Sequence, residues 1–140
     1  RLIAGLDEKN SRLIQAAARD MEERFFASPL GQWSLQAEYR ETEFPIITFS
    51  KVEGRTVTIT GQIDLLFEWE GAVHVVDFKT DRREVPDRHR GQLTAYTQAA
   101  GDIFDQPIRC WLFFLRTGHA VELTAGIQEG DLENLLAALV

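Results

Sequence analysis

Residues 61–79 read GQIDLLFEWEGAVHVVDFK, and this stretch decides the fold. The pair Glu70-Gly71 between runs of β-branched and aromatic residues predicts a tight β-hairpin. In a hairpin with a two-residue turn the numbers of facing residues have a constant sum, so Asp64 is predicted to face Asp77. The same register makes one side of the ribbon apolar, which is therefore predicted to face the core: Ile63 opposite Phe78, Leu65 opposite Val76, Phe67 opposite His74 and Trp69 opposite Ala72.

The other side of this hairpin carries two carboxylates. Asp64 and Asp77 would lie with about 5 Å between their Cβ atoms, and Gln62 would lie opposite Lys79. Like charges directly across a ladder are destabilising, and Lys79 alone offsets only part of the repulsion. A bound divalent cation would resolve the conflict. A three-residue turn would shift the register and remove this argument.

Carboxylate oxygens without a His or Cys cluster suit a hard cation, Mg²⁺ or Mn²⁺. Such an ion polarises a phosphoryl oxygen and lowers the pKa of bound water, and the ammonium of Lys79 could orient that water and offset developing charge. These residues therefore indicate phosphodiester hydrolysis. An isolated Asp-x-Lys is common on surface strands, so an ordinary interaction domain, with Asp64 and Asp77 far apart, is an alternative.

The flanking sequence predicts an α/β (α+β) domain around one mixed sheet, in the order α-β-β-β-α-β-β-α. Pro45 cannot donate to a ladder and favours an edge strand or a bulge. The expected elements are a helix over 7–27 stopped by Ser28-Pro29-Leu30-Gly31, strands over 33–49, 56–69 and 72–79, a helix over 87–100 capped by Asp87 and closed by Gly101, strands over 109–116 and 120–123, and a final helix carrying Leu132, Leu135, Leu136 and Leu139.

The whole chain sets further limits. Its 140 residues are 44% hydrophobic, which fits one domain over 1–140. Fifteen basic against 22 acidic residues leave a net charge of −7, which argues against nucleic-acid binding unless the acids hold metal and another domain supplies the binding groove. The absence of a long apolar run or a leader predicts a soluble, cytoplasmic protein without a membrane partner. Because the first residue is Arg1, the chain is expected to be a fragment of a longer protein.

Three ordered motifs resemble one known family: Gly61-Gln62-Ile63-Asp64-Leu65-Leu66, Val75-Val76-Asp77-Phe78-Lys79-Thr80-Asp81 and Gln92-Leu93-Thr94-Ala95-Tyr96. They look like the PD-(D/E)XK nuclease superfamily, specifically its RecB-like branch, the C-terminal nuclease domains of RecB- and AddA-type bacterial helicase–nucleases. The resemblance implies a restriction-endonuclease-like core, with a central mixed sheet flanked by helices. It also implies a DNA exonuclease module that uses Mg²⁺ or Mn²⁺ in recombinational repair, fused to or associated with a helicase motor and a partner subunit.

The resemblance also implies roles for individual residues. Asp64, Asp77 and the backbone carbonyl of Phe78 would bind the metal, and Lys79 would be the catalytic lysine. Gln92 and Tyr96 match the family's Q-x-x-x-Y motif, which lies near the active site and contacts DNA. Helical spacing also puts Arg88, Gln92 and Tyr96 on one face. Four arginines could receive the phosphate backbone, although a solvated charged loop explains them equally well: Arg82, Arg83, Arg88 and Arg90.

The sequence departs from the family in one respect. The family's metal-binding histidine, on a helix before these strands, has no counterpart, because His74 falls on the apolar side of the hairpin, His89 at a helix start and His119 at a turn. We expect that ligand to lie upstream of Arg1, with Glu41 or Glu43 as possible substitute acids.

Other absences narrow the function. A lone Cys110 excludes the family's iron–sulfur cluster, and no phosphate-binding loop for ATP occurs. The expected substrate of the nuclease is single-stranded DNA delivered by a fused helicase. The alternative is a degenerate domain that keeps the fold and binds DNA or a partner protein without cutting.

Overall fold

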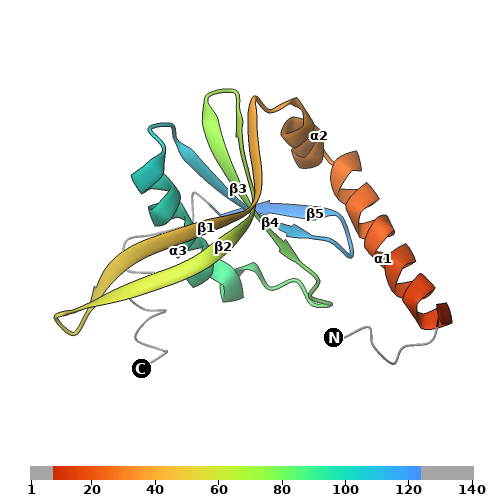
Figure 1. The fold of residues 1–140 in the computed structure, drawn as a ribbon, viewed down its shortest axis with the longest axis horizontal. Helices are drawn as coiled ribbons and strands as arrows, with labels where there is room; N and C mark the ends of the chain where they lie inside the picture. Colours follow the sequence, from red (N-terminus) through yellow and green to blue (C-terminus); the bar gives the residue numbers. More distant parts are fainter. Residues whose placement is uncertain (1–7, 124–140) are drawn as a thin grey trace.

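The computed structural model describes residues 8–123, which form a five-stranded sheet with helices on both faces (Figure 1). The elements, in chain order, are α1 (Glu8–Ala27), α2 (Pro29–Gln36), β1 (Tyr39–Val52), β2 (Arg55–Trp69), β3 (Ala72–Lys79), a 3₁₀ turn η1 (Pro86–His89), α3 (Arg90–Ile103), β4 (Ile108–Phe114) and β5 (His119–Glu122). The predicted final helix lies outside the described residues.

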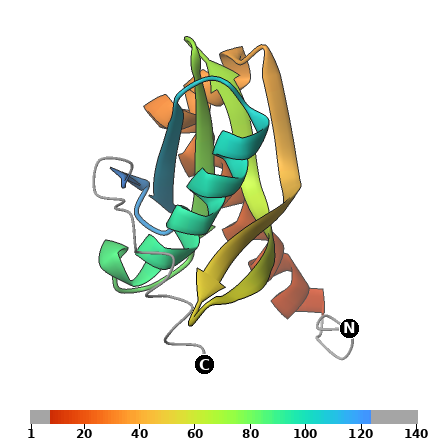
Figure 2. The same cartoon turned by 90° about the vertical axis from the view of Figure 1, so that its left-hand side faces the viewer.

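The sheet is mixed, as predicted. Its strands lie in the order β1-β2-β3-β4-β5, and β3 pairs with β4 in parallel while the other neighbours are antiparallel. The parallel pair requires a crossover, which α3 supplies across one face of the sheet, while α2 and the end of α1 pack on the other (Figures 1 and 2). β1 is an edge strand, as expected from Pro45. Within residues 8–123, no helix is long and apolar enough to span a membrane.

The predicted hairpin turn at Glu70-Gly71 is present, and a second turn of the same kind joins β1 to β2. Their two central residues adopt positive φ, with 51° and 78° at Glu53 and Gly54 and 49° and 77° at Glu70 and Gly71. These are the conformations that join strongly twisted antiparallel strands with two residues. The register of β2 on β3 is the predicted one over five pairs, from Trp69 with Ala72 to Leu65 with Val76.

Beyond Leu65 and Val76 the register prediction is wrong. The ladder ends there, so the residue pairs predicted further along do not form: Asp64 with Asp77, Ile63 with Phe78 and Gln62 with Lys79. Instead, the backbone N–H of Phe78 donates to the side chain of Asp64. The β2–β3 ladder therefore ends just before the two carboxylates.

The alternation of side chains along β1 and β2 is also interrupted at Asp64. Pairs on β1 and β2 flank residues 43 and 64 on both sides, but Glu43 has a φ of 51° and no ladder pair with Asp64 is formed. As a result Ile63 packs in the same cluster as Leu66, although strict alternation would put them on opposite faces. The distortion redirects every side chain of the β1–β2 ribbon beyond it.

The core differs from the single apolar side that we predicted. The sheet is buried on both faces, because α3 covers one and α1 with α2 covers the other. The cluster under α3 includes Ile63, Leu66, Val75, Leu93, Tyr96, Leu112 and Phe114. The cluster under α1 and α2 includes Phe25, Leu30, Leu65, Phe67, Val76 and Phe113.

The segment from Ser28 to Gly31 was predicted as a helix stop, but it begins a second helix. The Ser28 hydroxyl accepts from the backbone N–H of Gly31 at 3.1 Å, and Pro29 occupies the first turn, where its missing N–H costs nothing. The strand predicted from residue 33 therefore starts only at Tyr39. A Cβ at Gly31 would overlap the backbone of Phe25, so α1 and α2 meet closely here.

The helix predicted over 87–100 is also shifted. Asp87 lies in η1, and α3 begins at Arg90 after His89, which makes no side-chain cap. The helix continues past Gly101 to Ile103. Arg88 is therefore outside the α-helix, and the predicted helical face holds only for Gln92 and Tyr96.

Candidate active site

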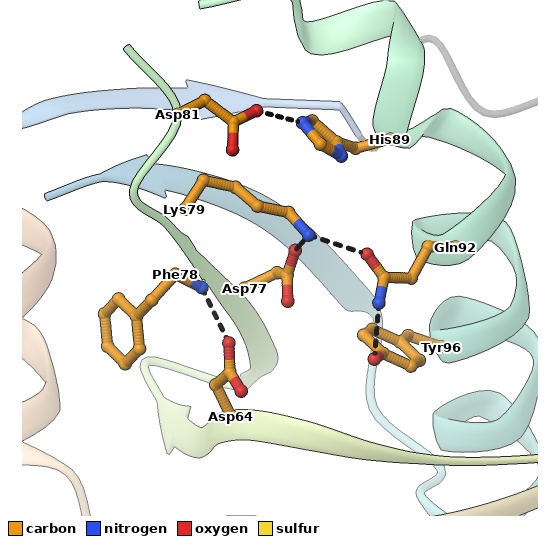
Figure 3. Close-up of polar contacts among 8 residues, drawn as sticks. All are labelled: Asp64, Asp77, Phe78, Lys79, Asp81, His89, Gln92 and Tyr96. Atoms are coloured by element: carbon orange, nitrogen blue, oxygen red, sulfur yellow. Dashed lines mark hydrogen bonds and ion pairs between the residues drawn. The ribbon is translucent and has the colours of Figure 1, made fainter. Parts of the chain in front are cut away.

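The candidate site lies where β2 and β3 separate, beside the first turns of α3 (Figure 3). It is at the carboxyl end of β3, one strand of the parallel pair. In open α/β sheets this end is where ligands bind. Asp64 comes from β2, Asp77 and Lys79 from β3, and Gln92 and Tyr96 from α3.

Asp64 is held by the neighbouring strand rather than by a ladder pair. Its Oδ2 accepts from the backbone N–H of Phe78 at 2.8 Å. The side chain is half-buried. This bond ties one carboxylate oxygen to β3 and brings Asp64 next to Asp77, as Figure 3 shows.

Asp77 is the most unusual group in the site. Only 3% of the residue is exposed, and no group in the described part of the chain donates a hydrogen bond to its buried Oδ2. Lys79 Nζ lies 2.7 Å from this oxygen and forms an ion pair with it. Burial raises the pKa of Asp77 to about 6 against the opposing effect of the Lys79 ammonium, and the charge of Asp64 adds to the rise.

Lys79 also contacts α3. Its ammonium donates to Gln92 Oε1 at 2.9 Å, and Gln92 Nε2 donates to the hydroxyl of Tyr96 at 2.9 Å. Burial raises the pKa of Tyr96, and the carboxylate of Asp77 adds to this, so the phenol keeps its proton. A continuous polar chain therefore runs from Asp77 through Lys79 and Gln92 to Tyr96 (Figure 3).

A contact that we did not foresee closes one end of the site. His89 Nε2 lies 2.9 Å from Asp81 Oδ2. Asp81 follows Lys79 by two residues and His89 precedes Gln92 by three, so the pair links the same strand end and helix. No local sequence signal predicts it, because it depends on where α3 docks.

The possible metal ligands suit a hard cation, but the set of ligands is incomplete in the described part of the chain. Within residues 8–123 no three His, Cys, Asp or Glu side chains gather around one point. The flanking pairs place Glu43 at the level of Asp64, but the side chains of both possible substitute acids, Glu41 and Glu43, are exposed. Two carboxylates, one with a buried oxygen lacking a donor, fit Mg²⁺ or Mn²⁺ better than zinc.

The remaining candidates lie outside the polar chain. Arg82 and Arg83 are exposed in the loop after β3, and Arg88 is exposed in η1. Arg90 pairs with Asp87 at 2.7 Å. The arginines border the site without contacting its carboxylates in any described interaction.

The other two histidines and the cysteine make packing or ion-pair contacts outside the polar chain. His74 is buried, stacks on Phe67 and accepts from Trp111 Nε1 at 3.1 Å. Burial, with a smaller effect of Arg109, lowers the pKa of His74 to about 4. His119 pairs with Glu84. Cys110 is buried.

Known proteins share both the sequence and the fold. The chain is 33% identical to a subunit of the ATP-dependent helicase/nuclease of Anoxybacillus flavithermus over 67% of its length, and 36% identical to the subunit of the same name from Lacticaseibacillus casei over 73%. It spans only 9% and 10% of those relatives. The crystal structure of SSO0001 superimposes with a TM-score of 0.51 at 16% identity, covering 88% of this chain and 65% of that one, which supports the restriction-endonuclease-like fold.

The sequence pattern of one family covers almost the whole chain. The PD-(D/E)XK nuclease superfamily matches residues 1–139. Together with the helicase/nuclease relatives, this confirms the resemblance drawn from the three motifs. The chain belongs to the PD-(D/E)XK nuclease superfamily, in its RecB-like branch.

Proposed function

We propose that this chain is the catalytic nuclease module of a helicase–nuclease and hydrolyses phosphodiester bonds in DNA with a divalent metal ion. The observation that carries the proposal is the buried Oδ2 of Asp77, which has no hydrogen-bond donor among the described residues and lies beside Asp64 and Lys79. Lys79 offsets only one of the two adjacent negative charges, so burying Asp77 beside Asp64 costs free energy unless a further cation binds them. A bound metal ion would supply that compensation.

Asp64, Asp77 and the carbonyl of Phe78 would hold the ion. In an extended strand the N–H and C=O of one residue point to the same side, and Phe78 directs its N–H to Asp64. Residues 73 and 79 direct their backbone groups the other way, toward β4 and the loops beside it. The Phe78 carbonyl therefore faces the gap that holds the two carboxylates. Bound Mg²⁺ or Mn²⁺ would polarise the phosphoryl oxygen and lower the pKa of water.

Lys79 would act on the substrate from the same side as the carboxylates. Its ammonium is a fixed positive charge in a partly buried site, where it stabilises negative charge that develops on the phosphoryl group more strongly than it would in water. Asp77 holds the ammonium in place. We assign the catalytic role to Lys79 on this basis.

The substrate and setting are proposed from the relatives and from the charges around the site. Those relatives are named helicase/nuclease subunits. We propose that a helicase motor of the same protein or complex delivers DNA, as single strands, for exonucleolytic cleavage in recombinational repair. Arg82, Arg83 and Arg88 would contact the phosphate backbone. Because the net charge of the chain is −7, other parts of the assembly must supply further positive charge for DNA binding.

The deciding experiment compares the full-length wild type with Asp77→Ala, Lys79→Ala and the matched control Asp102→Ala, on the exposed side of α3. End-labelled linear single-stranded DNA and its circular form are incubated with Mg²⁺, Mn²⁺ or EDTA. We expect cleavage of linear DNA by wild type and control in either metal, and a loss of at least about 100-fold in both site variants. Cleavage of circles would replace the exonuclease assignment with an endonuclease.

The second candidate function is a degenerate domain that binds DNA or a partner without cutting. The contact between Lys79 and Asp77, with Asp64 adjacent, argues for an enzyme because a binding module needs no buried carboxylate of this kind. Equal cleavage by wild type and both site variants, or none by wild type in any metal, would favour the degenerate domain.

A further inference from the structure

We propose that Gln92 is a positioning residue that fixes the direction of the Lys79 ammonium, and that Tyr96 in turn fixes Gln92. The inference rests on the proposed function and refines its site. It differs from a direct role of these two residues in DNA contact. The observations that carry it are the hydrogen bonds from Lys79 to Gln92 Oε1 and from Gln92 Nε2 to Tyr96, both at 2.9 Å (Figure 3).

The ammonium of a lysine has three N–H donors and rotates freely unless they are engaged. In Lys79, one side of the ammonium faces Asp77 Oδ2 at 2.7 Å, and one N–H donates to Gln92 Oε1. With one N–H held by Gln92 and the Asp77 carboxylate beside the ammonium, tetrahedral geometry sets the directions of the other two N–H groups. Removing Gln92 would leave the ammonium held by Asp77 alone, free to turn about that contact.

The ammonium of Lys79, which can only donate, requires the oxygen of the Gln92 amide, and the Tyr96 hydroxyl anchors the opposite end of that amide. The amide has an acceptor oxygen and a donor NH₂. With NH₂ donating to the Tyr96 hydroxyl, the oxygen faces the ammonium. The reversed amide would place two donor groups together, NH₂ and ammonium, and lose the contact. Tyr96 is 7% exposed and packs in the core cluster under α3, so the hydroxyl is a rigid reference point.

The helix that carries Gln92 is itself tied to the end of β3. Gln92 and Tyr96 lie one turn apart on the same helical face. Outside that turn, the contact between His89 and Asp81 joins the start of α3 to the residues that follow Lys79. Two contacts therefore set the distance between α3 and the strand end from which Lys79 extends.

A positioning role and a DNA-contact role for Gln92 and Tyr96 predict different changes in kcat, KM and Kd. A misdirected ammonium weakens transition-state stabilisation, so kcat falls while DNA affinity is kept. A lost DNA contact that is equal in ground and transition states raises KM and Kd while kcat at saturation is kept. The split between kcat and KM therefore separates the two roles once kcat is referred to the folded fraction of each variant, because a loss of folded protein also lowers apparent kcat.

The test uses Gln92→Met and Tyr96→Phe in the full-length protein, with Gln98→Met as the matched control. Gln98 is on the same helix and makes two hydrogen bonds, to Thr48 and to the carbonyl of Phe49, at a distance from the polar chain. Cleavage of a single-stranded oligonucleotide is measured at saturation in Mg²⁺, and binding of the same oligonucleotide is measured in EDTA by fluorescence anisotropy.

We expect kcat to fall about 10- to 100-fold in Gln92→Met and about 10-fold in Tyr96→Phe, with KM and Kd within about twofold of wild type. The control should stay within about twofold in every constant. An increase in Kd with unchanged kcat would overturn positioning in favour of DNA contact. Wild-type kcat in both site variants would overturn it as well.

A thermal-unfolding cycle tests the contact itself, whether or not the wild type cleaves DNA. Melting temperatures in EDTA are compared for wild type, Lys79→Met, Gln92→Met and the double variant. If Gln92 holds Lys79, the shift in the double variant is smaller than the sum of the single shifts. Additive shifts would overturn the inference. A wild type without nuclease activity would instead refute the proposed function and leave the cycle to decide on the contact.

Discussion

At the scale of single residues, Asp77 lowers the stability of the fold while it serves the proposed metal site. Its carboxylate is almost fully buried, one oxygen has no donor in residues 8–123, and the adjacent Asp64 repels it. A carboxylate in such surroundings destabilises the fold, and among residues 8–123 only Lys79 offsets this. Residues that serve a ligand are commonly retained at such a cost to stability.

This conflict predicts that Mg²⁺ stabilises the protein through Asp77. In EDTA, Asp77→Asn should melt at or above the temperature of wild type, because a neutral amide is easier to bury and is not repelled by Asp64, which outweighs the lost ion pair with Lys79. Adding 10 mM Mg²⁺ should raise the melting temperature of wild type but not that of Asp77→Asn, since only a ligand that binds the folded state stabilises it. Calorimetry with Asp102→Asn as control checks this. An equal rise in both proteins would place the metal elsewhere.

His74 gives a second prediction at this scale, on pH and stability. Its pKa is about 4 in the folded protein, below the ordinary value of 6.5, so folding favours the neutral ring. The stabilisation is complete above about pH 6.5 and is lost as the pH falls toward 4, because the unfolded chain then binds the proton first. The shift corresponds to about 3 kcal/mol of unfolding free energy.

The measurement for His74 is urea unfolding at pH values between 7.5 and 4.5 for wild type and His74→Gln. The glutamine side chain has no titratable group but can still accept from Trp111 Nε1. The difference in unfolding free energy between the two proteins should shrink below pH 6.5. A constant difference over this range would contradict the buried neutral ring.

At the scale of elements, the two helical glycines of α2 and α3 have opposite surroundings. Gly31 is packed against the backbone of Phe25 and Phe26, whereas a Cβ at Gly101 would meet nothing within 4 Å. Gly101 lies inside α3, where alanine is the better helix former. The same substitution should therefore change stability in opposite directions at the two positions.

We expect Gly31→Ala to destabilise the protein by about 2 kcal/mol or more, because α1 and α2 must separate. Gly101→Ala should stabilise it by about 0.5–1 kcal/mol. Chemical denaturation at pH 7 measures both. Destabilisation by Gly101→Ala, or tolerance of Gly31→Ala, would mean that the two helices pack differently.

The sequence predicted those elements whose cause is local. Glu70-Gly71 specifies its own turn, and the turn sets the register for five pairs, up to Leu65 and Val76. Sequence reasoning failed at Asp64, where the ladder ends, because that break depends on β1 and on the bond from Phe78. It missed α2 because a serine and a proline end one helix and begin the next with the same residues.

The candidate site was predictable in composition but not in its contacts. Asp64, Asp77 and Lys79 were expected together from hairpin spacing and family motifs, and they do lie together. The bond between Lys79 and Gln92 spans 13 residues and depends on how α3 docks on the sheet, which no local pattern specifies. The same holds for His89 and Asp81.

At the scale of the whole molecule, a net charge of −7 must be reconciled with DNA binding. The proposed contacts are few and local, on the loop after β3. We therefore expect weak binding with a shallow salt dependence. Each lost phosphate contact should reduce the slope of log K against log salt concentration by roughly 0.7 for single strands.

The corresponding prediction concerns Arg82→Ala/Arg83→Ala. In the full-length protein this double variant should bind single-stranded DNA more weakly and with a slope smaller by about 1.4 in magnitude. Arg19→Ala, an exposed change on α1, is the control and should leave the slope unchanged. Anisotropy titrations from 50 to 300 mM NaCl measure both. An unchanged slope in the double variant would remove these arginines from the DNA path.

The distortion at Glu43 and Asp64 also bears on how such a domain can change in evolution. Beyond it, β1 and β2 continue as a ribbon whose inner side chains, Val52, Val57 and Ile59, pack toward Ala95 of α3. The ribbon turns at Glu53 and Gly54, far along the strands from Asp64. Insertions or deletions of residue pairs at this tip would lengthen or shorten the ribbon without altering the pairing at its base. The reach of the ribbon can therefore diverge while the carboxylates keep their places.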